Sequence, residues 1–141
     1  MRYLALIIGS LLLFVALNNV VEAVEINMDI IAILESSGSP TAYNSSSNAR
    51  GLYQITPICL ADYNMYHESW YDLDDLWIPR ANKMIAVWYL NKRIPQLLKY
   101  FGHKDTVENR LISYNCGISC VGKPLPKETI NYIKKYERGI K

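Results

Sequence analysis

The chain has 141 residues, of which 15 are Lys or Arg and 13 are Asp or Glu, so its formal net charge is +2. A chain of this length suits one domain. A net charge this small does not indicate a nucleic-acid partner, and none is expected.

Residues 1–23 have the pattern of a secretory signal peptide. A basic start at Arg2 precedes an apolar run from Leu4 to Leu17, and Val21-Glu22-Ala23 suits a signal-peptidase site. The apolar run is shorter than the roughly 20 residues that a membrane span needs. We therefore expect export to the periplasm or the exterior and a mature domain of residues 24–141. An uncleaved N-terminal anchor is the alternative.

The first predicted helix follows this segment. Apolar residues recur at helical spacing from Ile26 to Leu34, and Asn27 is a polar residue suited to the helix start. The helix should end within residues 36–40, because Gly and Pro both disfavour its continuation. Residues 41–50 read as a loop, and a small β-hairpin within residues 41–56 is the alternative.

The remaining predicted elements are also helices. Pro79 is suited to open one of them, and Pro95 should divide it from a short helix over residues 97–101. Asp105-Thr106 is expected to cap another helix, and Pro126 to open the last one. For the helix after Pro79 the expected apolar stripe is Ala81, Met84, Ile85 and Trp88. The predicted fold class is therefore mainly α, in a single domain.

Five aromatic residues between the first helix and Pro79 could serve as stacking faces for sugar rings or as core. Most are expected in the core, because Trp and Tyr dominate small helical cores by buried area. They are Tyr63, Tyr66, Trp70, Tyr71 and Trp77.

Three cysteines, Cys59, Cys116 and Cys120, would leave at least one thiol unpaired if an exported chain formed a disulfide. The chain has only two histidines, which lie far from these cysteines in the sequence. A zinc site therefore has too few ligands, and we expect neither a metal nor another cofactor.

Glu35 stands where the first helix ends in a polar loop. At the C-terminal end of a helix a carboxyl group faces the negative end of the macrodipole, and burial would further favour its protonated form. Both effects suit a general acid that works near neutral pH. A solvated glutamate at a helix end is the alternative.

Three blocks of sequence resemble the soluble lytic transglycosylase family. The first is Glu35-Ser36-Ser37 followed by Ala49-Arg50-Gly51-Leu52-Tyr53-Gln54-Ile55, the second is Ser113-Tyr114-Asn115-Cys116-Gly117, and the third is Leu125-Pro126-Lys127-Glu128-Thr129 with Tyr132-Ile133. They occur in the family's order and cover nearly the whole mature chain. The resemblance implies a lysozyme-like fold and cleavage of peptidoglycan.

The resemblance also implies roles for individual residues. Glu35 matches the family's catalytic acid and base. A loop serine assists the reacting sugar in the family, and counting back from Gly51 favours Ser45 within the tract Ser45-Ser46-Ser47, whereas counting forward from Glu35 reaches Asn44. The other residues that match cleft or substrate-binding positions are Gln54, Tyr114, Asn115, Glu128 and Tyr132.

The expected reaction is cleavage of the β-1,4 bond between N-acetylmuramic acid and N-acetylglucosamine, with a 1,6-anhydromuramyl product. A lysozyme-type hydrolase and a non-catalytic glycan-binding module are the alternatives. The expected partner is the peptidoglycan glycan strand at the bacterial cell wall. An exported enzyme of this kind could also serve a secretion, pilus or conjugation machine.

Overall fold

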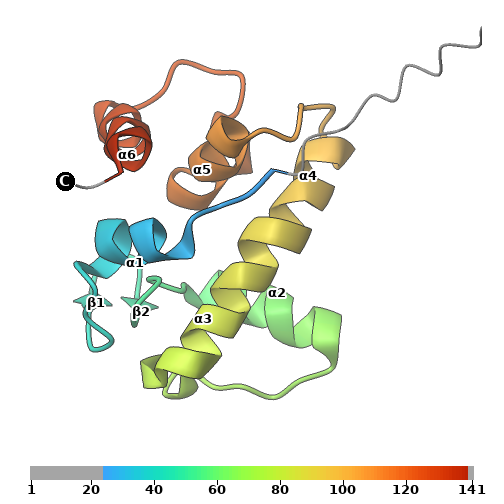
Figure 1. Cartoon of the computed structure of the whole chain (residues 1–141). Helices are drawn as coiled ribbons and strands as arrows, with labels where there is room; N and C mark the ends of the chain where they lie inside the picture. Colours follow the sequence, from blue (N-terminus) through green and yellow to red (C-terminus); the bar gives the residue numbers. More distant parts are fainter. Residues whose placement is uncertain (1–23, 140–141) are drawn as a thin grey trace, which may run out of the picture.

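The structure is a computed structural model that describes residues 24–139. It is mainly helical with one small antiparallel hairpin, as the sequence predicts (Figure 1). The α-helices are α1 (Met28–Ser36), α2 (Pro57–His67), α3 (Pro79–Trp88), α4 (Ile94–Tyr100), α5 (Val107–Asn115) and α6 (Lys127–Arg138). The hairpin joins β1 (Tyr43–Asn44) to β2 (Ala49–Arg50), with Tyr43 opposite Arg50. Short 3-10 turns lie at Asp75–Trp77 and Ile118–Cys120, and a π-helical segment lies at Tyr89–Arg93.

Helix α1 begins and ends where the sequence predicts. The Asn27 side chain accepts hydrogen bonds from the backbone N–H groups of Asp29 and Ile30, so it caps the first turn. After Ser36 the backbone of Ser37 adopts a left-handed conformation, and the Gly38 N–H donates back to the Ala32 carbonyl. This arrangement closes the helix one residue after Glu35 and turns the chain toward the hairpin.

The predicted division at Pro95 is wrong. Helices α3 and α4 follow one another as one long rod, joined by a π-helical segment at Tyr89–Arg93 (Figure 1). Proline lacks a backbone N–H, and the wider π turn just before it shifts the hydrogen bonding, with the Ile94 N–H donating to the Tyr89 carbonyl five residues back. The rod therefore absorbs the proline instead of ending there.

The predicted apolar stripe of α3 is rotated relative to the observed one. Met84 is exposed, whereas Asn82 is fully buried beside Ala81, Ile85 and Ala86. Asn82 enters the core because its amide makes three hydrogen bonds to backbone groups outside α3. A polar residue with all its hydrogen bonds satisfied is therefore part of the buried face.

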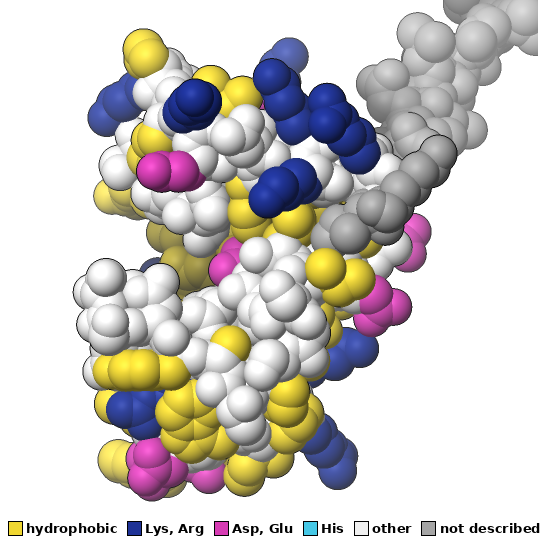
Figure 2. Space-filling view, turned by 90° about the vertical axis from the view of Figure 1, so that its left-hand side faces the viewer, with side chains coloured by type: hydrophobic (Ala, Val, Ile, Leu, Met, Phe, Trp, Pro, Cys, Tyr) yellow, Lys and Arg dark blue, Asp and Glu magenta, His cyan; other side chains and the backbone are white. Residues whose placement is uncertain are grey.

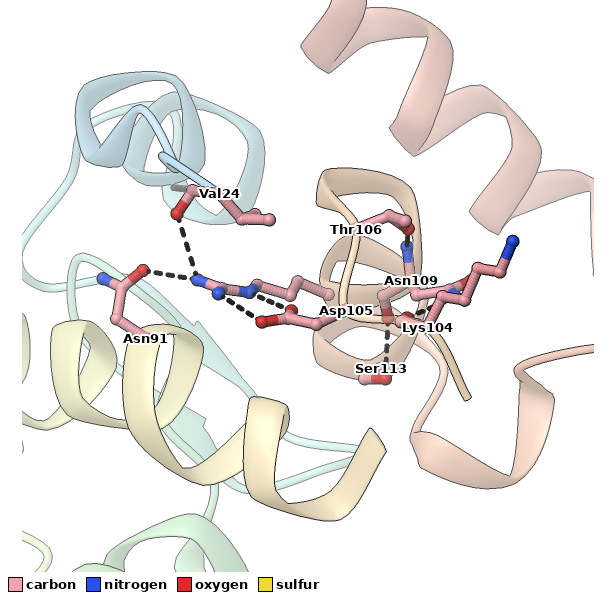
Figure 3. Close-up of polar contacts among 8 residues, drawn as sticks. Val24, Asn91, Lys104, Asp105, Thr106, Asn109 and Ser113 are labelled. Carbon is pink, nitrogen blue, oxygen red and sulfur yellow. Dashed lines mark hydrogen bonds and ion pairs between the residues drawn. The ribbon is translucent and has the colours of Figure 1, made fainter. Parts of the chain in front are cut away.

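Arg110 ties the start of α5 to the rod and to the beginning of the described chain. It is buried and makes a bidentate ion pair with Asp105, at 2.6 and 2.8 Å. Its Nη1 NH₂ group also donates to the Asn91 side chain, at 3.0 Å, and to the Val24 carbonyl, at 3.3 Å. Figure 3 shows Val24, Asn91 and Asp105 converging on this guanidinium. The predicted cap is confirmed beside it, where Thr106 accepts from the Asn109 N–H.

The core lies between the rod and the helices that pack on it. Helix α5 contacts both α4 and α6, α6 contacts α1, and α2 contacts α3. The prediction that most of the five aromatic residues lie in the core holds only in part. Tyr63 is buried and Tyr71 packs against the core, but Tyr66 is exposed and Trp70 is 93% exposed.

Cys116 and Cys120 form a disulfide, and Cys59 is a buried free thiol. The proposed signal peptide, residues 1–23, lies outside the described residues. Within residues 24–139, none of the helices combines the length and the apolar character that a membrane crossing requires.

Candidate active site

A cleft with a volume of about 570 Å³ opens beside the end of α1. Figure 2 shows the hollow on this face, below a lobe that carries many Lys and Arg side chains, with an acidic side chain at its inner end. Glu35 forms part of the wall together with the hairpin, the start of α2, the π-helical segment and the end of α5. The residues that line it are Glu35, Asn44, Ser47, Ala49, Gln54, Ile55, Thr56, Ile58, Cys59, Tyr89, Ser113, Tyr114, Asn115, Cys116 and Gly117.

Glu35 is half-buried, and Tyr132 of α6 is its hydrogen-bond partner. The Tyr132 hydroxyl donates to Glu35 Oε1 at 2.7 Å. The pKa of the Glu35 carboxyl is raised from 4.5 to about 7. Burial is the larger effect and raises the pKa, and the hydrogen bond from Tyr132 offsets part of that rise. The pKa of Tyr132 is also raised, mainly by burial and then by the charge of Glu35, so Tyr132 remains a donor. The carboxyl is therefore poised to hold and release a proton near neutral pH.

The loop from Gly51 to Gln54 contributes Gln54 to the cleft wall, and side-chain hydrogen bonds hold its backbone in place. Asn82 of α3 accepts from the Tyr53 N–H at 2.7 Å and donates to the carbonyls of Arg50 and Leu76, at 2.8 and 3.0 Å. The Gln54 backbone has a positive φ. The side-chain amide of Gln54 donates to the backbone carbonyls of Ala42 and Gly51, both at 3.0 Å. Both amides therefore hold the loop in shape.

Sequence reasoning missed Asn82. Asn82 lies next to the apolar residues of α3 in the sequence. A single amide among apolar residues is the signal that could indicate a buried, hydrogen-bonded side chain. Ser36 directly follows Glu35, and its position in the sequence does not indicate a role. Its hydroxyl donates to Ala32 within α1 and lies 2.8 Å from the Leu52 carbonyl of the returning loop. Both residues act on the cleft by holding the backbone that forms it.

Tyr114 and Asn115 form the wall at the end of α5. The Tyr114 hydroxyl donates to the Tyr53 carbonyl at 2.7 Å, which joins this wall to the loop. Burial, with a smaller effect of the Glu35 charge, raises the pKa of Tyr114 well above its usual value, so its hydroxyl keeps its proton. The Asn115 side chain is exposed to the cleft and accepts from Thr129 of α6 at 2.9 Å.

The structure brings four of the predicted site residues, Glu35, Gln54, Tyr114 and Asn115, to one cleft, with Tyr132 directly behind Glu35. Ser45 and Glu128 are placed differently. Ser45 is exposed in the hairpin turn and does not line the cleft, whereas its neighbours Asn44 and Ser47 do. Glu128 is exposed in the first turn of α6 and also lies outside the lining.

Cys59 and the disulfide border the same cleft but offer no nucleophile or metal site. Cys59 is buried, and burial raises the pKa of its thiol to about 12, so the thiolate is not formed near neutral pH. Among residues 24–139, no group of three or more His, Cys, Asp or Glu side chains could hold a metal ion.

A second hollow, of about 600 Å³, lies against another part of the α2 surface. Its wall includes Arg50, Asn64 and Asp74, and Arg50 is paired with Asp74 at 3.0 Å. It contains neither Glu35 nor any of the other predicted site residues. The cleft at Glu35 is therefore the candidate active site.

The family model of the transglycosylase SLT domain matches residues 21–136. The chain belongs to the transglycosylase SLT family. The match covers the three sequence blocks and every element from α1 through most of α6, and the mainly helical fold with its small hairpin agrees with a lysozyme-like SLT domain. At the family level, an SLT domain has a transglycosylase-type function related to peptidoglycan. Comparisons with curated proteins and with solved structures gave no match.

Proposed function

We propose that this SLT domain is a peptidoglycan lytic transglycosylase in which Glu35 acts first as general acid and then as general base. Its substrate is the β-1,4 bond between N-acetylmuramic acid and N-acetylglucosamine. The observation that carries the proposal is the position of Glu35, which lies in the wall of the cleft with its pKa raised to about 7. An acid with that pKa is protonated in a large fraction of molecules at neutral pH and can also accept a proton later in the cycle.

The set of acids in the cleft favours a lyase over an ordinary glycosidase. Inverting and retaining glycosidases place two carboxyl groups on either side of the scissile bond. Among the described residues that line the cleft, Glu35 is the only carboxylic acid. A single acid can suffice when the substrate supplies its own nucleophile, and the 6-hydroxyl of the muramyl sugar is suited to this role.

Glu35 donates a proton in the first step and takes one back in the second. Its carboxyl donates that proton to the glycosidic oxygen, the C1–O bond breaks, and the N-acetylglucosamine leaves with a new 4-hydroxyl. The muramyl acetamide stabilises the cationic centre at C1. The ionised Glu35 then removes the proton from the 6-hydroxyl, O6 bonds to C1, and the 1,6-anhydro ring closes. Glu35 is protonated again at the end, and no water is consumed.

The surrounding side chains fit this sequence. Tyr132 fixes Oε1 of Glu35 by its hydrogen bond, which leaves Oε2 to carry the proton toward the cleft. Gln54, Tyr114 and Asn115 lie in the wall. Because Gln54 Nε2 and the Tyr114 hydroxyl donate to backbone carbonyls, Gln54 Oε1 and the Asn115 amide are the groups proposed to contact the sugars. Ser47 or Asn44 is better placed than Ser45 to reach the substrate, since both of them line the cleft.

The export signal in residues 1–23 would deliver the domain of residues 24–141 to the periplasm or the exterior, where peptidoglycan lies. Local opening of the wall for a secretion, pilus or conjugation machine is a use consistent with a single small domain.

The proposal is tested by Glu35→Gln beside Glu25→Gln, assayed on purified cell-wall sacculi and by zymography. Glu25 is exposed ahead of α1 and serves as the matched control. General acid–base catalysis contributes about 10²–10⁴-fold to a rate, so Glu35→Gln should lower wall cleavage by at least about 100-fold while Glu25→Gln cleaves like the wild type. Full clearing by Glu35→Gln would contradict the role of Glu35. A wild-type protein that binds sacculi without cleaving them would favour the non-catalytic module.

A further inference from the structure

Two hydroxyl groups on one face of α6 bond to side chains that line the cleft. Thr129 and Tyr132 are three residues apart, so they lie on the same side of the helix, and both are buried. Tyr132 bonds to Glu35 of α1, and Thr129 bonds to Asn115 of α5. Neither Thr129 nor Tyr132 lines the cleft, so each acts through the side chain that it holds.

In the hydrogen bond between Thr129 and Asn115, Thr129 is the donor. The Thr129 hydroxyl donates to Asn115 Oδ1 at 2.9 Å, and Thr129 is only 2% exposed. Oδ1 is the acceptor that the structure gives this hydroxyl within the described residues, and a buried hydroxyl proton without an acceptor would be unfavourable. The Asn115 amide is therefore held with its oxygen toward α6, which leaves its NH₂ group as the part of the amide that can face the cleft lined by Asn115.

The backbone beside Asn115 is also fixed. The Cys116 N–H donates to the Ile112 carbonyl at 2.8 Å, and the disulfide ties Cys116 to Cys120 in the following turn. Rotation of the side chain is the main freedom that remains to Asn115, and the bond from Thr129 restricts it. The cleft wall thus presents a hydrogen-bond donor whose direction is set from α6.

We propose that Thr129 is a positioning residue that aims the Asn115 NH₂ group at a carbonyl oxygen of the glycan, the acetamide carbonyl of an N-acetylated sugar. This inference rests on the proposed function for its substrate class. A primary amide NH₂ has two donors and no acceptor, so this wall selects an acceptor group on the sugar. A sugar whose acetamide is replaced by a free amine presents a charged donor at this position and loses the contact.

Binding is the test, because it does not depend on turnover. Affinities for a chitin-type N-acetylglucosamine tetramer and for the corresponding glucosamine tetramer are measured by calorimetry on Glu35→Gln protein. Thr129→Val keeps the side-chain shape but removes the hydroxyl, and Thr129→Ser keeps the hydroxyl. Thr129→Val should weaken binding of the acetylated tetramer by about tenfold, the scale of one hydrogen bond, and Thr129→Ser by no more than about twofold. Neither change should alter the affinity for the glucosamine tetramer.

Asn115→Asp supplies a second variant if Thr129→Val fails to fold. It keeps an acceptor for Thr129 but replaces the donor that faces the cleft, so it should weaken binding of the acetylated tetramer at least as much as Thr129→Val. Equal losses on both tetramers, a loss in Thr129→Ser that matches that in Thr129→Val, or no binding of the acetylated tetramer by the Glu35→Gln parent would overturn the inference. Activity of the wild type on sacculi reports on the proposed function separately, since a glycan-binding protein without turnover would fail that assay and still show the Thr129 effect.

Discussion

A carboxyl group buried at the end of α1 binds its proton more tightly in the folded protein than in the unfolded chain. Below pH 4.5 the Glu35 carboxyl is protonated in both states. As the pH rises toward 7, the unfolded chain releases the proton first, so the free energy of unfolding falls. A pKa shift from 4.5 to about 7 corresponds to about 3 kcal/mol, and this loss is complete above the folded pKa.

Replacing Glu35 by Gln removes this titration and is therefore expected to stabilise the protein in a pH-dependent way. At pH 8 Glu35→Gln should exceed the wild type by up to about 3 kcal/mol in the free energy of unfolding. The difference should shrink steadily as the pH falls toward 4.5. Urea unfolding at several pH values measures it, with Glu25→Gln as the control. A difference that does not change with pH would show that Glu35 has an ordinary pKa.

If Glu35 is the general acid as proposed, Tyr132 should influence the upper end of the pH range of activity. Its hydrogen bond lowers the pKa of Glu35, so Tyr132→Phe should raise that pKa further. The proposed acid step needs protonated Glu35, and the alkaline limb of the plot of kcat/KM against pH should therefore move to higher pH. A pH–rate profile of both proteins on solubilised wall fragments measures the shift. A limb that stays in place or moves to lower pH would show that Glu35 is not the group that titrates.

At the scale of elements, the cleft depends on the close approach of the Gly51 loop to α3. Gly51 has a positive φ of 78°, and a Cβ atom there would overlap the Leu76 carbonyl and the Asn82 amide. These groups belong to the hydrogen bonds that shape the loop. Gly38 has the same φ, but a Cβ atom there would meet no neighbouring atom. Substitutions at the two glycines therefore distinguish the cost of a left-handed backbone from the cost of a steric clash.

We expect Gly38→Ala to cost about 1 kcal/mol in the free energy of unfolding, the cost of a left-handed backbone alone. Gly51→Ala should cost at least about 3 kcal/mol, because the loop or Asn82 must also move. It should lower wall cleavage as well, whereas Gly38→Ala should not. Thermal unfolding and wall cleavage of the two variants give the comparison. Equal effects would mean that the contact with α3 does not hold the loop.

At the scale of the whole molecule, local patterns predicted much of the fold. Asn27 and Thr106 cap helices because their side chains can replace missing backbone partners, and that property is visible in a few neighbouring letters. Glu35 could be singled out for the same reason, since the helix break follows directly after it. The blocks of family resemblance predict that Gln54, Tyr114 and Asn115 share a cleft with Glu35, and all four line the same cleft.

What could not be predicted depends on distant contacts. The π-helical segment lets the long helix continue past Pro95. Asn82 of α3 points inward because it forms hydrogen bonds with Tyr53 and Arg50, which are distant in the sequence. Trp70 is exposed although its type favours the core. The position of the hairpin residues relative to the cleft is likewise set by tertiary folding. The spacing back from Gly51 favours Ser45, which is not in the wall, whereas Asn44, at the spacing forward from Glu35, and Ser47 line it.

The most direct test of the central proposal is the identity of the products that the wild type releases from sacculi in ¹⁸O-labelled water. A lyase with Glu35 as its single acid should yield 1,6-anhydromuropeptides that are one water lighter than hydrolysis products and contain no ¹⁸O at C1. Mass spectrometry of the soluble fragments reads both properties at once. Reducing muramyl ends that carry ¹⁸O would contradict the account and identify the enzyme as a hydrolase.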